Sequence, residues 1–274
     1  MNIAVLSGKG GTGKTTVSTN LSIILDSNYI DCDVEEPNGF IFLRPEEINV
    51  RGVEVDIPVI SKDKCTLCGD CVKVCNFNAL GKSKSKIIVF DKLCHGCGTC
   101  RLACQKGALK YDKKTIGIIE EGIKGNIVCK RGVLNISEPM AVPILRELLQ
   151  EIPSGINILD SPPGTSCNVV NTLEYADKAI LVTEPTVFGL HDLKMAIELV
   201  KMFKIPFGLI INKYDDGNVL LENFIEKESI DVLGYIPYNK KAAKVYSKGN
   251  MLIDIFEYKE IFQDIAGNIR EVIL

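Results

Sequence analysis

A glycine-rich loop near the start of the chain constrains the fold more than any other feature of the sequence. The segment "GKGGTGKT" (8–15) satisfies G-x-x-x-x-G-K-[S/T], and it lies between an apolar run at 2–7 and a helical pattern at 14–25. A strand, a glycine loop and a helix in this order form a phosphate-binding loop, in which backbone N–H groups at the helix N-terminus hold phosphate. The sequence therefore predicts a nucleotide site built on an α/β fold.

Each residue type in this loop has an expected role. Backbone N–H groups of residues 10–14 would surround the phosphates, Lys14 would neutralise the β and γ oxygens, and Thr15 would hold Mg²⁺. We expect ATP or ADP with Mg²⁺ to bind at Gly8, Gly10, Gly11, Thr12, Gly13, Lys14, Thr15 and Thr16.

The rest of the chain alternates apolar runs with helical patterns. We expect strands at 2–7, 29–33, 156–160, 178–183, 207–212 and 232–237, and helices at 14–25, 143–152, 190–203 and 220–228. Strands that alternate with helices predict a doubly wound, mostly parallel sheet. The alternation stops between residues 59 and 113. The sequence therefore predicts a discontinuous P-loop ATPase domain (1–58 and 114–274) interrupted by a small inserted α+β ferredoxin-like domain (59–113).

Eight of the 11 cysteines fall within this insert, in two matching runs. The segments "CTLCGDCVKVCNFNAL" (65–80) and "CHGCGTCRLACQKGAL" (94–109) align cysteine for cysteine at an offset of 29 residues. Each run has the bacterial ferredoxin spacing C-x2-C-x2-C-x3-C, in which three cysteines bind one [4Fe–4S] cluster and the fourth binds the neighbouring cluster. This pattern assigns Cys65, Cys68, Cys71 and Cys104 to cluster 1, and Cys94, Cys97, Cys100 and Cys75 to cluster 2. A pair of zinc knuckles is the alternative, although zinc sites usually space their C-x2-C pairs further apart.

The insert resembles two-cluster bacterial ferredoxins over about 50 residues. It departs from them where a proline usually follows each fourth cysteine, since Asn76 and Gln105 stand there; the departure weakens a turn preference and leaves the ligand set intact. Residues 59–113 hold 10 Lys and 1 Arg against 4 Asp, a net +7, so the remainder of the chain carries −10. Part of this positive charge would offset the anionic clusters. The rest indicates either a solvated lysine-rich surface or a docking face for an acidic electron carrier.

A lysine directly after the first glycine, Lys9, makes the loop similar to that of the MinD/Mrp class of ATPases, to which the nitrogenase iron protein also belongs. In that class this lysine contacts phosphate across a dimer, so the resemblance implies a homodimer when ATP is bound. The segment "DCDVEEPN" (31–38) resembles the first switch, which implies that Asp33 orients the attacking water. The segment "ILDSPPG" (158–164) resembles the Walker B strand and second switch, which implies that Asp160 lies near Mg²⁺ through water.

The resemblance extends to the base-binding region. The segment "INK" (211–213) resembles the adenine-recognition turn, which implies that Asn212 contacts the base, and "IPYN" resembles the late loop that flanks the base through Pro237. A branch of the class carries a ferredoxin module after the first switch, and "VTEPTVFGLHDLK" (182–194) resembles that branch closely. The alternatives are that the aspartates within 31–38 are ordinary strand-end caps and that the asparagine within 211–213 is an ordinary turn former.

Two cysteines outside the insert have the spacing of those that hold the subunit-bridging cluster of the nitrogenase iron protein. Cys167 lies seven residues after Asp160, and Cys129 lies upstream. The resemblance implies a further cluster at a dimer axis, and two ordinary free thiols are the alternative.

Several classes of protein are disfavoured by the sequence. No run of 18 apolar residues occurs, and the first residues lead into a strand without the basic region or cleavage site of a signal peptide, so we expect a cytoplasmic protein. The C-terminal segment 257–274 has helical spacing with acidic and basic residues mixed on its polar face, which favours packing onto the domain over a membrane surface. No basic stripe interleaved with aromatic residues indicates a nucleic-acid partner.

Three functions fit these observations. In the first, ATP controls electron transfer through two clusters to a partner protein or to a metallocluster under construction. In the second, the ATPase cycle delivers iron–sulfur clusters to apo-proteins. In the third, a positioning or regulatory ATPase senses redox state through its clusters.

Overall fold

The computed structural model describes residues 1–215 and 219–272 of the chain. Within these residues, nine strands form one sheet: β1 (Asn2–Leu6), β2 (Asn28–Asp31), β3 (Glu46–Ile60), β6 (Leu109–Lys124), β7 (Ile127–Leu134), β8 (Asn157–Asp160), β9 (Lys178–Thr183), β10 (Phe207–Tyr214) and β11 (Val232–Pro237). Their order is β11-β10-β9-β1-β8-β2-β7-β6-β3. The strands from β11 to β7 pair in parallel, whereas β6 and β3 continue the sheet as antiparallel strands.

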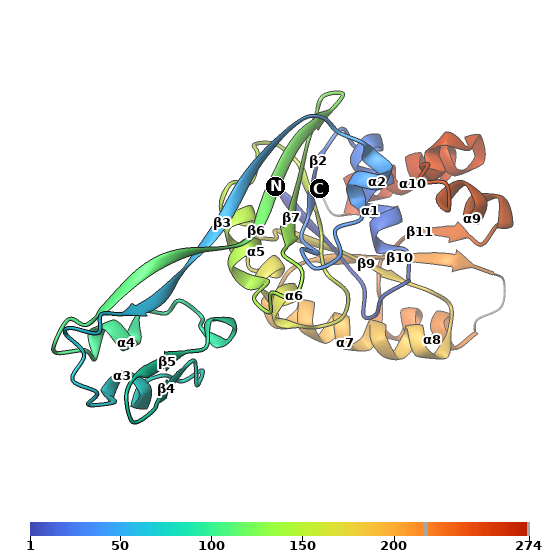
Figure 1. The fold of residues 1–274 in the computed structure, drawn as a ribbon. Helices are drawn as coiled ribbons and strands as arrows, with labels where there is room; N and C mark the ends of the chain where they lie inside the picture. The colour runs from blue at the N-terminus through green and yellow to red at the C-terminus, as the bar shows by residue number, and fades with distance from the viewer. Residues whose placement is uncertain (216–218, 273–274) are drawn as a thin grey trace.

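Helices cover both faces of the parallel part of the sheet (Figure 1). They are α1 (Lys14–Ile24), α2 (Gly39–Leu43), α5 (Val142–Gln150), α6 (Cys167–Leu173), α7 (Val187–Phe203), α8 (Val219–Glu228), α9 (Lys240–Tyr246) and α10 (Phe256–Val272), with a 3-10 turn at Leu252–Asp254. Alternate side chains of β1 enter two separate cores: Ala4 and Leu6 pack on the side of α5 to α8, and Ile3 and Val5 on the side of α1 and α10. This two-sided burial makes the central strands continuously apolar, as parallel strands require.

The predicted doubly wound sheet is confirmed. Each of the six expected strands is present with both ends within two residues of the expected ones, and the expected helices correspond to α1, α5, α7 and α8. The C-terminal segment forms α10, which packs on the domain through Phe262, Ile265 and Ile269, while residues 273–274 lie outside the described part of the chain. No helix in the described part is both long enough and apolar enough to cross a bilayer.

Sequence patterns missed three strands of this sheet, β3, β6 and β7. Strand β3 pairs with β6 from Glu46↔Ile123 to Ile60↔Leu109, and β6 pairs with β7 from Gly117 to Lys124. Most β3 side chains are exposed or half-buried, and Val53 and Val55 are among the few that reach the core. Apolar and polar residues alternate at 48–51 and again at 53–57, with a change of face at Gly52, so the sequence did hold a pattern typical of a strand that the expected strands left out.

Beyond these strands lies a small lobe, residues 61–108, which we call the cysteine lobe. It contains α3 (Asp70–Lys73), β4 (Leu80–Lys82), β5 (Ile87–Val89), a 3-10 turn (Asp91–Leu93) and α4 (Thr99–Leu102). Figure 1 shows the lobe at the far end of the β3–β6 ribbon, well away from the helices that cover the main sheet. Its core is formed by Cys71, Leu80, Ile87 and Cys100, together with Leu109 at the start of β6. Strands β3 and β6 therefore connect the cysteine lobe to the domain that carries the glycine loop, and they hold the lobe away from that domain.

Candidate functional site

The glycine loop lies between the end of β1 and the start of α1, as expected. Lys14, the first residue of α1, is buried, and its Nζ lies 3.3 Å from Asp160 Oδ1 at the end of β8. Ser18 Oγ donates to the same carboxylate oxygen at 3.1 Å. The fold therefore brings together the two residues expected to bind phosphate and to lie near Mg²⁺, although 146 residues separate them in sequence.

Two buried hydroxyl groups at this site have no hydrogen-bond partner in the described residues. They are Thr12 Oγ1 in the glycine loop and Ser161 Oγ directly after Asp160. A buried hydroxyl without a partner costs free energy, so such groups mark places where a polar ligand binds. Their positions suit the phosphates and hydrated Mg²⁺ of a nucleotide.

A second group of carboxylates lies behind Asp160. Tyr29 OH is 2.8 Å from Asp160 Oδ2 and 3.1 Å from Asp31 Oδ2, and all three side chains are buried. Burial, followed by the negative charge of Asp160, raises the pKa of Asp31 to about 7. Asp33, the expected water-orienting residue, is half-buried, and burial likewise raises its pKa. The end of β2 therefore holds several acidic groups close to the phosphate site.

Lys9 is paired within its own chain. Its Nζ forms a salt bridge with Glu184, which follows β9, and Lys213 Nζ lies 3.1 Å from the other oxygen of Glu184. Lys213 Nζ also donates to Gly11 O at 2.7 Å. A contact of Lys9 across a dimer, as the resemblance implies, requires this lysine to leave Glu184.

A cavity of about 340 Å³ opens beside the glycine loop. Asn212 and Pro237, the two residues expected to flank a base, both line it, together with Gly13, Tyr238 and Tyr246. Asn212 Nδ2 donates to Thr12 O at 2.7 Å, which joins the base region to the phosphate loop. The aromatic and aliphatic walls of this cavity, with few polar groups, are typical of pockets that bind flat organic rings.

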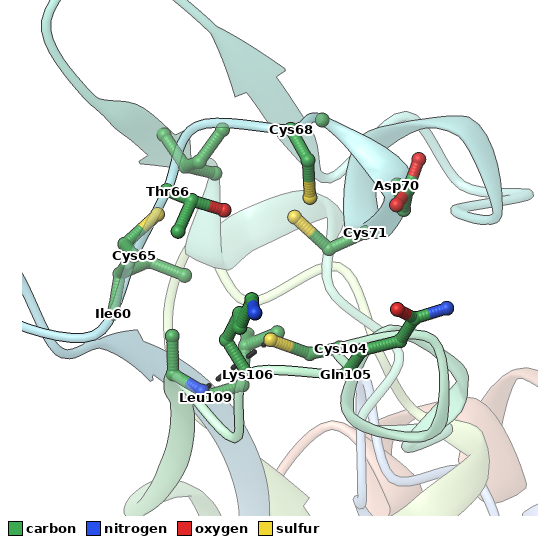
Figure 2. Close-up of a pocket in the computed structure, with 13 residues that line it drawn as sticks. Ile60, Cys65, Thr66, Cys68, Asp70, Cys71, Cys104, Gln105, Lys106 and Leu109 are labelled. Atoms are coloured by element: carbon green, nitrogen blue, oxygen red, sulfur yellow. Dashed lines mark hydrogen bonds between the residues drawn. The ribbon is translucent and has the colours of Figure 1, made fainter.

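The cysteine lobe contains two cavities, and each is lined by four cysteines. Cys65, Cys68, Cys71 and Cys104 line the first, and Figure 2 shows their sulfur atoms around its edge. Cys75, Cys94, Cys97 and Cys100 line the second. The fourth cysteine of each run thus lies with the first three of the other run, the same grouping that the ferredoxin spacing predicts.

The two halves of the lobe also repeat their backbone conformation. Positive φ angles occur at Leu67 (58°), Gly69 (88°) and Asn78 (53°), and again 29 residues later at Gly96 (64°), Gly98 (78°) and Gly107 (59°). Two backbone hydrogen bonds to sulfur repeat in the same way, from Ala79 N to Cys75 Sγ and from Ala108 N to Cys104 Sγ, both 3.3 Å. The repeat in the sequence is therefore a repeat in structure.

In the described residues no three His, Cys, Asp or Glu side chains converge closely enough to hold a single metal ion.

The two cysteines with the spacing of a bridging pair are not brought together at one surface. Cys129 lies on β7 and is fully buried among Tyr29, Phe40 and Leu43, and its burial raises the pKa of the thiol to about 12. Cys167 is exposed at the start of α6. A bridging cluster at these two cysteines would therefore require β7 to expose Cys129, and it stays a prediction.

Sequence reasoning missed Tyr29, Ser18 and Glu184. Tyr29 and Ser18 reach the phosphate site because β2 and α1 flank the strand that carries Asp160, and no motif marks either residue. Glu184 lies in "VTEPT", a segment that resembled a branch of the MinD/Mrp class without any role being implied for this residue.

Comparisons with known proteins agree with the fold and with nucleotide binding. An uncharacterized protein of Methanocaldococcus jannaschii is 34% identical over 97% of this chain and 97% of the relative. An iron-sulfur cluster carrier protein of the same organism is 26% identical over 98% of this chain and 84% of the relative.

Among solved structures, the septum site-determining protein MinD of Pyrococcus horikoshii, complexed with Mg-ADP, aligns with a TM-score of 0.60 at 19% identity, covering 98% of this chain and 95% of that one. This likeness shows the MinD-like fold. Residues 3–253 match the family model described as the CobQ/CobB/MinD/ParA nucleotide binding domain, which supports the expected P-loop ATPase. The chain therefore belongs to the CobQ/CobB/MinD/ParA family of nucleotide-binding proteins.

Proposed function

We propose that this protein is an ATP-dependent iron–sulfur protein, in which residues 59–113 bind two [4Fe–4S] clusters and the nucleotide state controls electron transfer through them. The observation that supports this most directly is the sorting of eight cysteines into two cavities, four to each. In both cavities the fourth cysteine comes from the opposite half of the lobe. This exchange of the fourth cysteine between the two halves is typical of two-cluster ferredoxins.

The chemistry of each cavity fits an iron–sulfur cluster. Each supplies four thiols, and thiolates are the soft ligands that iron–sulfur clusters require. The backbone N–H groups that donate hydrogen bonds to Cys75 Sγ and Cys104 Sγ stabilise negative charge on sulfur. When bound, the clusters would supply one-electron transfer, while the chain would hold them, limit water access and set their surroundings.

Contacts between the expected first switch and β7, the strand that pairs with β6, support nucleotide control. Leu134 N donates to Val34 O at 2.8 Å, which joins segment 33–38 to the end of β7. Arg131 on β7 reaches Pro37 O at 3.4 Å and forms a salt bridge with Glu120 on β6. A switch that moves on ATP binding would therefore move against the strands that hold the cysteine lobe.

We further propose a homodimer in the ATP-bound state. Lys9 lies at the exposed edge of the phosphate loop, where its partner Glu184 can release it to a nucleotide. A redox partner protein or a metallocluster client would bind the cysteine lobe, whose exposed lysines favour an acidic surface.

The experiment that tests cluster binding is anaerobic purification followed by iron counting and EPR. We expect about eight irons per chain. Cys104→Ala should remove the signal of the same cluster as Cys65→Ala and leave the signal that depends on Cys94. Cys32→Ala, which alters a buried thiol outside both cavities, is the matched control and should keep both signals. Iron near zero in the wild type would refute the proposal.

Nucleotide control is tested separately. The rate of electron transfer from the reduced clusters to a soluble acceptor, measured with and without MgATP, should change by about tenfold, which corresponds to about 1.4 kcal/mol. Equal rates in the presence of full iron would reject control by ATP and leave the clusters as an independent relay.

Delivery of clusters to apo-proteins is a second candidate function, favoured by the similarity to the iron-sulfur cluster carrier protein of M. jannaschii. This function needs a labile cluster, whereas electron transfer needs clusters that stay. Incubation of the loaded protein with an apo-ferredoxin distinguishes the two, because ATP-dependent loss of iron to the acceptor indicates a carrier.

A further inference from the structure

A series of buried, hydrogen-bonded side chains runs from the phosphate site to the start of α2. Tyr29 and Asp31 lie two residues apart on β2, so their side chains point to the same side of the sheet. The hydroxyl of Tyr29 lies within hydrogen-bonding distance of both Asp160 and Asp31. A phenol carries one proton, so this hydroxyl donates to one carboxylate at a time.

Asp31 continues the chain to α2. Its Oδ2, the oxygen near Tyr29, also accepts from Gly39 N at 2.9 Å, and its Oδ1 accepts from Asp33 N at 3.2 Å. Gly39 is the first residue of α2, and a Cβ built there would lie 2.0 Å from Tyr29 OH. The absence of a side chain at Gly39 therefore lets α2 approach the tyrosine this closely.

Helix α2 leads directly into β3. Phe40 and Leu43 pack against the buried ring of Tyr29 in one core cluster, and Arg44 and Pro45 then connect α2 to Glu46, where β3 begins. A displacement of α2 thus displaces the root of the strand that ends at the cysteine lobe.

The two oxygens of Asp160 face different partners. Oδ1 contacts Lys14 and Ser18, on the phosphate side, and Oδ2 contacts Tyr29. When Lys14 moves to the β and γ phosphates and hydrated Mg²⁺ lies beside Oδ1 in its place, the charge that balances Asp160 changes, and with it the carboxylate to which the Tyr29 hydroxyl donates. Asp31 keeps the N–H of Gly39 in either case.

We propose that Tyr29 and Asp31 are positioning residues that pass the state of the phosphate site to α2 and to the root of β3. This inference rests on the proposed function for what β3 transmits, but the link itself is independent of the clusters. The hydroxyl of Tyr29 is the switching group, since it lies within reach of both Asp160 and Asp31 and donates to one of them at a time. The aromatic ring fills the core and stays in place in both states.

Tyr29→Phe tests the link, because it keeps the ring and removes the hydroxyl. The readout is hydrogen exchange of the backbone amides of residues 39–60 in the holoprotein, with and without the non-hydrolysable MgATP analogue AMPPNP. In the wild type, nucleotide should change these exchange rates by about tenfold. In Tyr29→Phe, measured at a saturating concentration of AMPPNP, we expect this change to be lost.

Tyr175→Phe is the matched control, since this half-buried tyrosine precedes β9 and lies far in sequence from α2. It should keep the wild-type response. Asp31→Asn, which keeps the shape of the side chain, is the second variant. It should also lose the response, and it replaces Tyr29→Phe as the test if that variant does not fold. A response at residues 39–60 that persists in Tyr29→Phe or, where that variant does not fold, in Asp31→Asn would overturn the inference.

The outcome is separable from that of the proposed function. A wild-type exchange response at residues 39–60 together with unchanged electron-transfer rates would refute ATP control of the clusters and leave the link standing. No exchange response at residues 39–60 in the wild type would overturn the link, whatever the clusters do.

Discussion

Replacement of Gly13 by alanine should destabilise the nucleotide-free protein, and the structure gives the size of the effect. Gly13 caps α1 with φ 92°, a left-handed conformation that costs a residue with a Cβ about 1–2 kcal/mol. A Cβ at this position would lie 2.0 Å from Asn212 Nδ2, so the amide of Asn212 must move. Its hydrogen bond to Thr12 O then breaks, at a cost of about 1–2 kcal/mol. We expect Gly13→Ala to lower the free energy of unfolding by about 2–4 kcal/mol.

Gly10→Ala is the matched control in the same loop. No heavy atom of the described residues lies within 4 Å of a Cβ built on Gly10, and its φ lies outside the left-handed range, so we expect a change of about 0.5 kcal/mol or less. Urea denaturation of both variants without nucleotide measures the two values. The reasoning would be refuted if the two variants differed by less than about 0.5 kcal/mol.

Two further predictions concern Lys9 and the free thiols. Hydrogen bonds from Lys9 and Lys213 lower the pKa of Glu184 despite its partial burial, and Lys9 must leave this carboxylate to reach a phosphate. Glu184→Gln should therefore tighten AMPPNP binding by about two- to fivefold in a calorimetric titration, and weaker binding would contradict the prediction. Because burial raises the pKa of Cys129 to about 12, iodoacetamide at about pH 8 should modify Cys167 and leave Cys129 unmodified in a mass spectrum. Modification of Cys129 before Cys167 would show instead that β7 opens readily.

The parts of the fold that the sequence predicted share one physical property. Strands β1 and β8 to β11 are buried by helices on both faces, so they are short apolar runs between helical patterns. Strand β3 alternates apolar and polar residues at 48–51 and 53–57, but apolar side chains such as Ile48, Val50 and Val59 are exposed, because the ribbon it forms with β6 leaves the body of the protein. Its pairing depends on a partner that begins 49 residues further along the chain, and local patterns hold no information about such a partner.

The same division applies to the candidate site. Lys14, Asn212 and Pro237 were predicted because each belongs to a local motif with its own mechanism. Tyr29 was missed because its role depends on Asp160, which is 131 residues away in sequence. For this reason the residues expected to contact a ligand can be predicted from motifs, whereas the residues that position them can be identified only once the fold is known.

The geometry of the ribbon indicates how a nucleotide can act on distant clusters. Beyond its last pair with β7 at Gly117, the ribbon continues along residues 54–60 of β3, which span about 20 Å at about 3.3 Å per residue. This length is about twice the Debye length at physiological salt, so the charge of a bound nucleotide has little direct effect on the clusters. A rotation of about 10° at the root would move the lobe by about 4 Å, because a displacement grows with distance from its pivot. Control by ATP should therefore change where the clusters stand relative to a partner, and leave their midpoint potentials in the monomer nearly unchanged.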